Sequence, residues 1–389
     1  MKLPRLPHAL TEDVMTTRKL ALNLKRNRGQ DHTTKLDQAA ASFDYEAAKL
    51  EWWNPEDQSL LHGTALWEGS SDDQRRLLNQ LYWVAYYSQI ISAEVATIFF
   101  NQTAAAGLYG MEDFRVVGDT LDMESNQERA HIAAFQTINE ATEAALFGER
   151  LFTWPMRGPY AETMIFPDSG RLRTWWKQLQ LRTFGLLSSG NAFIASQYLT
   201  VRGLRTLNGK MVQERLARFD GQSVPSLVSA YHFEDESYHF NSSTIIGKDV
   251  VRSLPSPTRF ESLVANLGIR GCQQDHAKFS VVVRGLFWHE PATFAAVYRL
   301  LRSKHFAFDD RGARDMMWRC FCQDSDGLQA AFATQREARE TYKVYVHDLP
   351  FMWQSNLDMS MMQNASIDRY LTTNQVALGR FVPPALVAA

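Results

Sequence analysis

The sequence has few cysteines and no strong excess of charge of either sign. Only three of its 389 residues are cysteines, Cys272, Cys320 and Cys322. Three thiols cannot form a disulfide framework, and a single C-x-C without a second cysteine pair does not predict a zinc site. The formal net charge of -2 gives no reason to expect a nucleic-acid partner. Residues 1–13 also lack the apolar run of a signal peptide, so we expect a cytoplasmic protein.

Long apolar runs are almost absent as well. Residues 81–100 approach the length and apolarity of a membrane span, but Glu94 lies inside them and no second segment matches them. A helix that is apolar on all sides can also form the centre of a soluble bundle. We therefore expect no membrane span. An acid inside such a helix is a candidate functional residue in either setting.

Alternation of apolar and polar residues with period two is missing, which predicts an all-α protein. The division expected is an irregular N-terminal arm at 1–65, a metal-binding helical bundle at 66–250, and a C-terminal helical extension at 251–389. Within the bundle the pattern predicts helices at about 70–110, 111–147, 171–207 and 211–219, with a last one starting near Pro225.

Two segments carry the same arrangement of carboxylates and histidines. In each, three side chains are spaced i, i+4 and i+7, so a helix presents all three on one face. The two patterns are Glu124-x-x-x-Glu128-x-x-His131 and His232-x-x-x-Glu236-x-x-His239. A single E-x-x-H usually lies on a solvated surface, but two matched faces in one chain predict a shared site.

A dinuclear metal centre in a four-helix bundle uses this chemistry, because two helices each give a Glu and two others each give Glu-x-x-His. Glu94 lies 34 residues before Glu128 (128 − 94), and a glycine-containing turn at 107–111 falls midway between them. An antiparallel hairpin would place these acids opposite each other. Oxygen and imidazole ligands favour iron or manganese.

The pattern resembles the ferritin-like diiron oxygenases, and in particular the AurF-type N-oxygenases, over roughly residues 70–245. This resemblance implies that Asp235 is the supporting partner of a ligand histidine, a place where the first motif has Gln127. It also implies the following metal ligands: Glu94, Glu128, His131, His232, Glu236 and His239.

One ligand of that family is missing. The family has a fourth carboxylate on the helix before the last motif, but residues 184–213 contain no acid. Gln197 stands in a local context like that of Glu94, Glu214 follows too near the turn, and Glu124 offers a charge from its own helix. Arg202 and Arg205, on the same segment, either neutralise an anion or lie on the surface.

A lost carboxylate leaves an open position on one metal, which in mononuclear iron halogenases is where halide binds. The chain is similar in this respect to the CylC-type cyanobacterial dimetal halogenases. The resemblance implies an enzyme of natural-product biosynthesis that uses two iron ions (or manganese), O2, halide and an external reductant. Its expected substrate is an aliphatic acid or acyl chain, free or on a carrier protein, and its expected partner is an electron donor. A homodimer is also compatible with the resemblance. The alternatives are a diiron N-oxygenase or hydroxylase, and a helical metal-binding protein without catalysis.

Overall fold

The computed structural model describes residues 10–109, 114–152, 171–276, 291–347, 349, 351–363 and 366–384. The chain is 78% helical and its described residues form no strand, which confirms the predicted all-α class. In the same residues no helix is long and apolar enough to cross a membrane. The three-part division of the chain stays a prediction.

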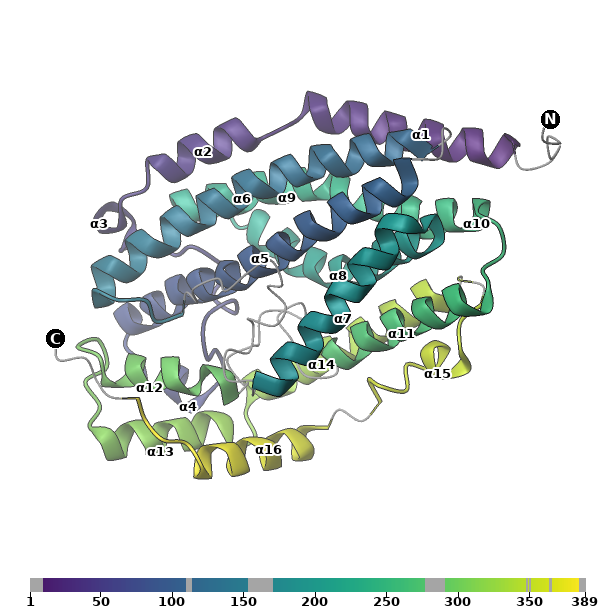
Figure 1. Ribbon diagram of the computed structural model, residues 1–389. Helices are drawn as coiled ribbons and strands as arrows, with labels where there is room; N and C mark the ends of the chain where they lie inside the picture. Colours follow the sequence, from purple (N-terminus) through teal and green to yellow (C-terminus); the bar gives the residue numbers. More distant parts are fainter. Residues whose placement is uncertain are drawn as a thin grey trace, which may run out of the picture.

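Four long helices form the centre of the molecule (Figure 1). They are α5 (Asp72–Tyr109), α6 (Arg115–Phe147), α8 (Ala192–Ala217) and α9 (Val224–Thr244). Helices α5 and α6 fold back on each other as the hairpin expected from the sequence; residues 110–113 of the turn lie outside the described residues. Aromatic side chains of Trp83, Tyr87 and Phe135 pack between the helices, with none more than 1% exposed.

The prediction of a single helix at 171–207 is wrong. The structure has two helices there, α7 (Arg171–Gly190) and then α8, which continues through Asn208 and Gly209. The break lies at Asn191, whose side-chain oxygen accepts a hydrogen bond from Ile194 N at 2.9 Å and so caps α8. An interior glycine costs a helix only about 1 kcal/mol relative to alanine, so tertiary packing overrides the Asn-Gly stop signal.

The prediction that the N-terminal arm is irregular is also wrong in part, because most of its described residues are helical. Helices α1 (Leu10–Gly29) and α2 (Thr33–Ala41) lie along α6 and α9 at the top of Figure 1, followed by short α3 (Tyr45–Ala48) and α4 (Ala65–Glu68). Trp53 fixes the arm to the bundle, since it is fully buried and its backbone N–H donates to Asn79 Oδ1 at 2.9 Å.

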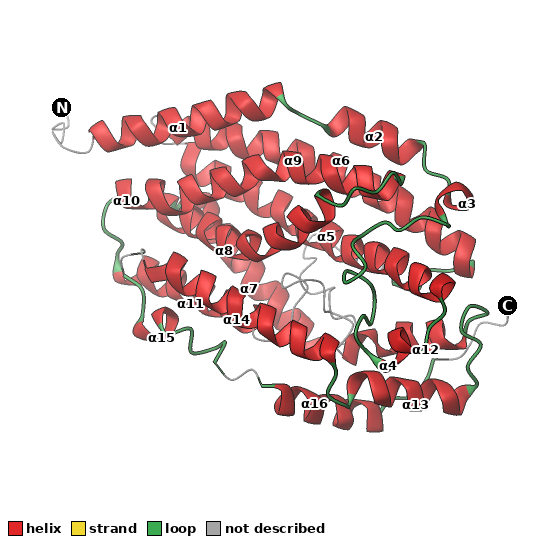
Figure 2. Ribbon diagram, turned by 180° about the vertical axis from the view of Figure 1, so that it is seen from behind, coloured by secondary structure: helices red, strands yellow, loops and turns green. Residues whose placement is uncertain are grey.

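The chain after α9 wraps the lower side of the bundle with further helices, seen from behind in Figure 2. Helix α9 begins at the cap residue Ser223, has Pro225 in its first turn as predicted, and runs into a π-helix, η3 (Ile245–Val250). The later elements are α10 (Val251–Ser253), α11 (Arg259–His276), η5 (Pro291–Thr293), α12 (Phe294–Arg302), α13 (Asp310–Phe321), α14 (Asp326–His347), α15 (Gln354–Leu357) and α16 (Ile367–Gly379).

Candidate metal centre

A cluster of histidines and carboxylates lies buried between α5, α6 and α9. Helix α5 contributes Glu94, α6 contributes one Glu and one His three residues apart, and α9 contributes two His and one Glu. Every one of these side chains is at most 6% exposed. The six residues expected to be ligands therefore all reach one place: Glu94, Glu128, His131, His232, Glu236 and His239.

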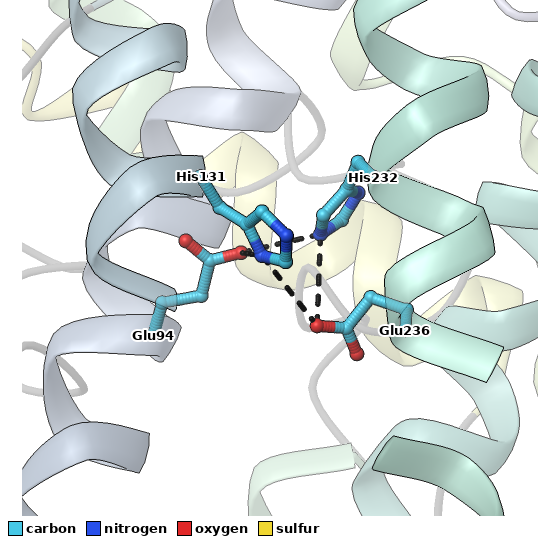
Figure 3. Close-up of side chains that lie close together, drawn as sticks. All are labelled: Glu94, His131, His232 and Glu236. Atoms are coloured by element: carbon cyan, nitrogen blue, oxygen red, sulfur yellow. Dashed lines mark ion pairs between the residues drawn. The ribbon is translucent and has the colours of Figure 1, made fainter. Parts of the chain in front are cut away.

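Four of these residues form a first group that could hold a metal ion, and one potential ligand atom of each lies within 4.8 Å of the others. Figure 3 shows Glu94, His131, His232 and Glu236 pointing toward one another. Nε2 of His232 lies 3.2 Å from Glu94 Oε1, and Nδ1 of His131 lies 3.8 Å from both Glu94 Oε1 and Glu236 Oε1.

A second group of three residues, Glu128, Glu236 and His239, shares Glu236 with the first. Nδ1 of His239 lies 2.8 Å from Glu236 Oε1 and 3.4 Å from Glu128 Oε1. Glu128 also reaches the first group, since its Oε2 lies 3.3 Å from His131 Nδ1. The arrangement therefore offers two adjacent positions for metal ions, one with four protein ligands and one with three.

The crowded charges shift the pKa values of the site in opposite directions. Burial together with the charges of Glu128 and Glu236 raises the pKa of Glu94 well above its usual range. Burial and the nearby His131 lower the pKa of His232 to about 3, so that its imidazole stays neutral, the form that binds metals. Burial opposes protonation of His131, but hydrogen bonds to Asp235 and Glu128 raise its pKa to about 10.

The same effect is present at His239. Burial opposes its protonation, but the charges of Glu236 and Glu128 raise the pKa of His239 to about 10. Without a cation, the carboxylates are therefore balanced by protons on two imidazoles. A divalent cation placed between them would replace those protons, because a histidine must be neutral to act as a ligand.

The histidine of each E-x-x-H pattern is supported by a residue of the other helix. Nε2 of His131 on α6 lies 3.3 Å from Oδ2 of Asp235 on α9, while Nε2 of His239 on α9 lies 2.9 Å from Oε1 of Gln127 on α6. Both contacts use the ring nitrogen that faces away from the cluster and leave Nδ1 toward it. Such contacts fix the ring orientation and the tautomer of a metal ligand.

The N-terminal arm holds both of these supports in place. Asn27 of α1 forms a reciprocal amide pair with Gln127, at 2.9 and 2.8 Å, which turns the Gln127 oxygen toward His239. His32 donates its backbone N–H to Asp235 Oδ1 at 3.0 Å. Sequence reasoning missed Asn27 and His32, since neither belongs to a local motif and each lies at least 100 residues from its partner.

Glu124 lies one turn before Glu128 but has other partners. Arg202 Nη1 donates to its Oε2 at 2.6 Å, and the Ser242 hydroxyl donates to its Oε1. Arg202 itself is only 5% exposed and also donates to Asn101 Oδ1 at 3.1 Å. Arg202 thus neutralises an anion, one of the two roles expected for it; the side chain of Arg205 lies outside the described residues.

The other two candidates for the place of the missing carboxylate, Gln197 and Glu214, both lie on α8. Gln197 lies five residues from Arg202, which places it about 140° around α8 from the side chain that faces α5 and α6. Its amide is buried without a hydrogen-bond partner among the described residues. Glu214 forms an ion pair with Arg218 and is partly exposed. On the described part of α8, no acid joins the ligand groups.

The fold and the cluster define a class: an all-helical protein with a buried histidine–carboxylate site suited to metal ions. The chain belongs to the CylC-like acyl halogenase family, whose model matches residues 15–382. No curated protein and no solved structure matches the chain. The match extends over the N-terminal arm and the C-terminal helices as well as the bundle. The protein is therefore an enzyme of a halogenase family that acts on acyl substrates.

Proposed function

We propose that this protein is a dimetal enzyme, with iron as its metal, that uses O2 to replace a hydrogen of an unactivated aliphatic C–H bond by halogen on an acyl substrate. The observation that carries the proposal is the pair of ligand groups joined by Glu236. Family membership supplies halogenation and the acyl class of substrate. The six ligands named above, with Asp235, Gln127 and Glu124 as supporting residues, are part of the proposal.

The residues present fit two metal ions. Both oxygens of Glu94 and both nitrogens of His232 are buried and make no hydrogen bond within the described part of the chain, although His232 Nε2 and Glu94 Oε1 lie 3.2 Å apart. This is costly unless a cation engages them. Mixed carboxylate and imidazole ligands suit iron or manganese rather than a thiolate-bound metal. Three carboxylates leave the four charges of two divalent ions partly unbalanced, which favours binding of an anion such as halide.

When bound, the metal pair would supply the redox chemistry that activates O2. The chain's own residues do the rest. Asp235 and Gln127 orient His131 and His239 with Nδ1 toward the cluster. Tyr87 and Phe135 pack edge-on against the His232 ring and exclude water from its side of the site. Arg202 forms an ion pair with Glu124 that holds it outside the ligand groups, so the position of the fourth carboxylate stays open for halide.

Two alternatives remain as competing hypotheses. If water or a displaced carboxylate fills the open position, the same ferritin-like site would hydroxylate carbon or oxygenate an amine. The other alternative is a helical metal-binding protein without catalysis. A buried site whose histidine supports are themselves held by distant hydrogen bonds favours catalysis, because catalytic ligands must be fixed precisely.

The remaining partners are also proposals. The acyl chain arrives free or on a carrier protein, and an electron donor supplies reducing equivalents. We place the enzyme in the cytoplasm from its cysteine usage. One face of α7 exposes a stripe of large apolar side chains, which supports a homodimer because such stripes commonly mark protein contacts. The stripe consists of Leu172, Trp175, Trp176, Leu179 and Leu186.

The test is reconstitution with ferrous iron without oxygen, elemental analysis, and then exposure to O2 with an acyl substrate in chloride or bromide. We expect two metals per chain and a product whose mass follows the halide supplied. Glu236→Ala should lose metal and turnover together, whereas Glu140→Ala, an exposed residue of α6, should keep both. A hydroxylated product in every halide would favour the oxygenase, and two metals without any product would favour the non-catalytic alternative.

A further inference from the structure

The outer face of α1 is strongly basic in a chain that is slightly acidic overall. Between Asp13 and Asp31 the sequence holds five basic residues and no acid. All five are exposed, and around the helix they surround Leu22, which is itself 49% exposed. Among the described residues of this face, only Lys19 has an ion-pair partner, Asp249 at 3.4 Å. The basic face of α1 consists of Arg18, Lys19, Leu22, Lys25, Arg26 and Arg28.

The inner face of the same helix is in contact with the proposed metal site. Asn27 lies nine residues from Arg18, which places it about 180° around the helix, directly beneath the basic face. Asn27 pairs with Gln127, and Gln127 Oε1 lies 2.9 Å from Nε2 of His239. Just after α1, His32 contacts Asp235, which in turn contacts His131. A single side chain, Gln127 or Asp235, therefore lies between this arm and each of two proposed ligands.

Halogenation with O2 needs electrons from outside. Reduction of O2 to two waters takes four electrons and four protons. Conversion of R–H and halide to R–X releases two electrons and one proton. The balance is R–H, halide, O2, three protons and two electrons giving R–X and two waters. None of the chain's side chains can supply the two electrons repeatedly, so a separate donor must deliver them near the ligands.

We propose that the basic face of α1 is the docking surface for an acidic one-electron donor protein of the ferredoxin class. The inference rests on the proposed function, which creates the demand for electrons. Unpaired cations attract a partner of opposite charge and speed its association. The hydrogen-bonded contacts from Asn27 through Gln127 to His239, and from His32 through Asp235 to His131, link this surface to both metal positions.

A charged membrane or nucleic acid fits this surface less well. An interfacial membrane helix needs a broad apolar face, whereas α1 exposes one leucine among its charges. Nucleic-acid binding usually accompanies a basic domain, and this chain has a net charge of -2. A compact acidic protein needs only a local cluster of cations with an apolar contact at its centre, which is what α1 provides.

The experiment uses the iron-loaded full chain and a plant-type [2Fe–2S] ferredoxin as the acidic probe. Arg18→Glu/Lys25→Glu/Arg26→Glu tests the basic face of α1. Lys304→Glu/Arg311→Glu/Arg319→Glu makes the same change of charge on exposed residues at α12 and α13, on the opposite side of the molecule in Figure 1. Binding is followed by calorimetry at low and high salt, and iron reduction by stopped-flow absorbance with either reduced ferredoxin or dithionite.

We expect the α1 variant to bind ferredoxin about tenfold more weakly or worse at low salt, and to be reduced by it correspondingly more slowly. Dithionite, which is small, should reduce all three proteins alike, and the α13-side variant should match the parent. A neutral variant, Arg18→Gln/Lys25→Gln/Arg26→Gln, should lose an intermediate amount of ferredoxin affinity. It serves as a second test in case the charge-reversed variant does not fold.

Equal ferredoxin binding and reduction in the parent and the α1 variant would overturn the inference. An equal loss in both triple variants would also overturn it, because the effect would then be general charge. The inference would also be overturned if the α1 variant bound anionic lipid vesicles more weakly than the parent but bound ferredoxin equally well. Failure of the proposed function looks different: the dithionite-reduced enzyme would give no product with O2, whatever the ferredoxin affinity.

Discussion

The carboxylate of Asp235 lies 3.3 Å from Nε2 of His131, a histidine on a different helix. The D-E-x-x-H pattern on α9 therefore supports a proposed ligand on α6, and the backbone N–H of His32 fixes the other oxygen of Asp235. A contact of this kind couples the two halves of the bundle. Its loss should loosen the His131 ring without removing a ligand.

Asp235→Asn tests this contact. An amide keeps the shape but removes the charge, so we expect metal affinity to fall about 10–100-fold. The measurement is competitive titration of ferrous iron against a chelator. Asp122→Asn makes the same change at an exposed position of α6; it is the matched control and should leave affinity within about twofold. An unchanged affinity in Asp235→Asn would show that the contact does not orient the ligand.

The two ligand groups are unequal, which predicts unequal loss of metal. Glu128→Gln should leave one metal per chain, because it removes a ligand from the three-residue group, whereas the four-residue group loses only a neighbour of His131 and keeps its four ligands. Glu236→Ala should leave none, since both groups share that residue. Elemental analysis after removal of loosely bound iron gives the counts. Loss of both metals from Glu128→Gln would contradict two separately held positions.

The buried pair of Arg202 and Glu124 predicts a large effect on stability. Arg202→Met leaves Glu124 buried and unpaired, and breaking a buried pair in this way costs about 3–5 kcal/mol. The double variant Arg202→Met/Glu124→Gln should recover much of that loss, because no charge is then left uncompensated. Urea unfolding of four proteins, the parent, each single variant and the double variant, measures the free energies. Additive effects would mean that the two side chains are not coupled.

The raised pKa values of His131 and His239 predict how the metal-free protein responds to pH. Both folded-state values, about 10, lie above the ordinary 6.5. Their stabilising effect is therefore fully present below about pH 6.5 and is lost as pH rises toward 10. The free energy of unfolding of metal-free protein should fall across that range. Metal-loaded protein should lack this fall, since its imidazoles are already neutral.

The same protons predict the pH dependence of metal binding. Iron must displace them, so apparent affinity should rise with pH between about 6.5 and 8, with protons released on binding. Calorimetry in two buffers of different ionisation enthalpy counts the protons. Binding that releases no proton at pH 7 would show that the histidines are neutral before the metal arrives.

The exposed stripe on α7 predicts the response of the oligomeric state to a charge. Trp175 and Trp176 are 56% and 53% exposed. Trp175→Glu/Trp176→Glu should convert a homodimer to a monomer, because a charge in an apolar contact carries a desolvation penalty. Light scattering after size exclusion measures the mass. Val376→Glu, an equally exposed apolar residue on α16, is the control. A monomeric parent protein would contradict the homodimer.

Much of the clustering of histidines and carboxylates could be predicted because these residues belong to local repeats. Residues three, four and seven apart share a helical face whatever surrounds the helix, so the spacing alone placed Glu128 beside His131 and Glu236 beside His239. The apolar setting of Glu94 and the turn midway to Glu128 were enough to predict their hairpin. The all-α class followed in the same way, from the absence of period-two patterns.

The errors arose where tertiary packing overrides local signals. Asn208-Gly209 reads as a helix end, yet α8 passes through it, and the true break at Gly190 and Asn191 has a weaker signal. The N-terminal segment is polar and looked irregular, but α1 and α2 are stabilised by packing against α6 and α9. The comparison of Gln197 with Glu94 rests on local alignment alone, and the role of Gln197 stays a prediction.

The sequence by itself determined the helical class and the two ligand-bearing faces, because the 3.6-residue repeat of a helix fixes which neighbours share a face. Only the tertiary structure decided which residues surround those faces. Asp235 contacts the histidine of another helix, and Arg202 forms an ion pair with Glu124. Asn27 and His32 of the N-terminal arm form hydrogen bonds to Gln127 and Asp235. Each contact joins residues at least 78 positions apart, and no local pattern encodes a distance of that kind.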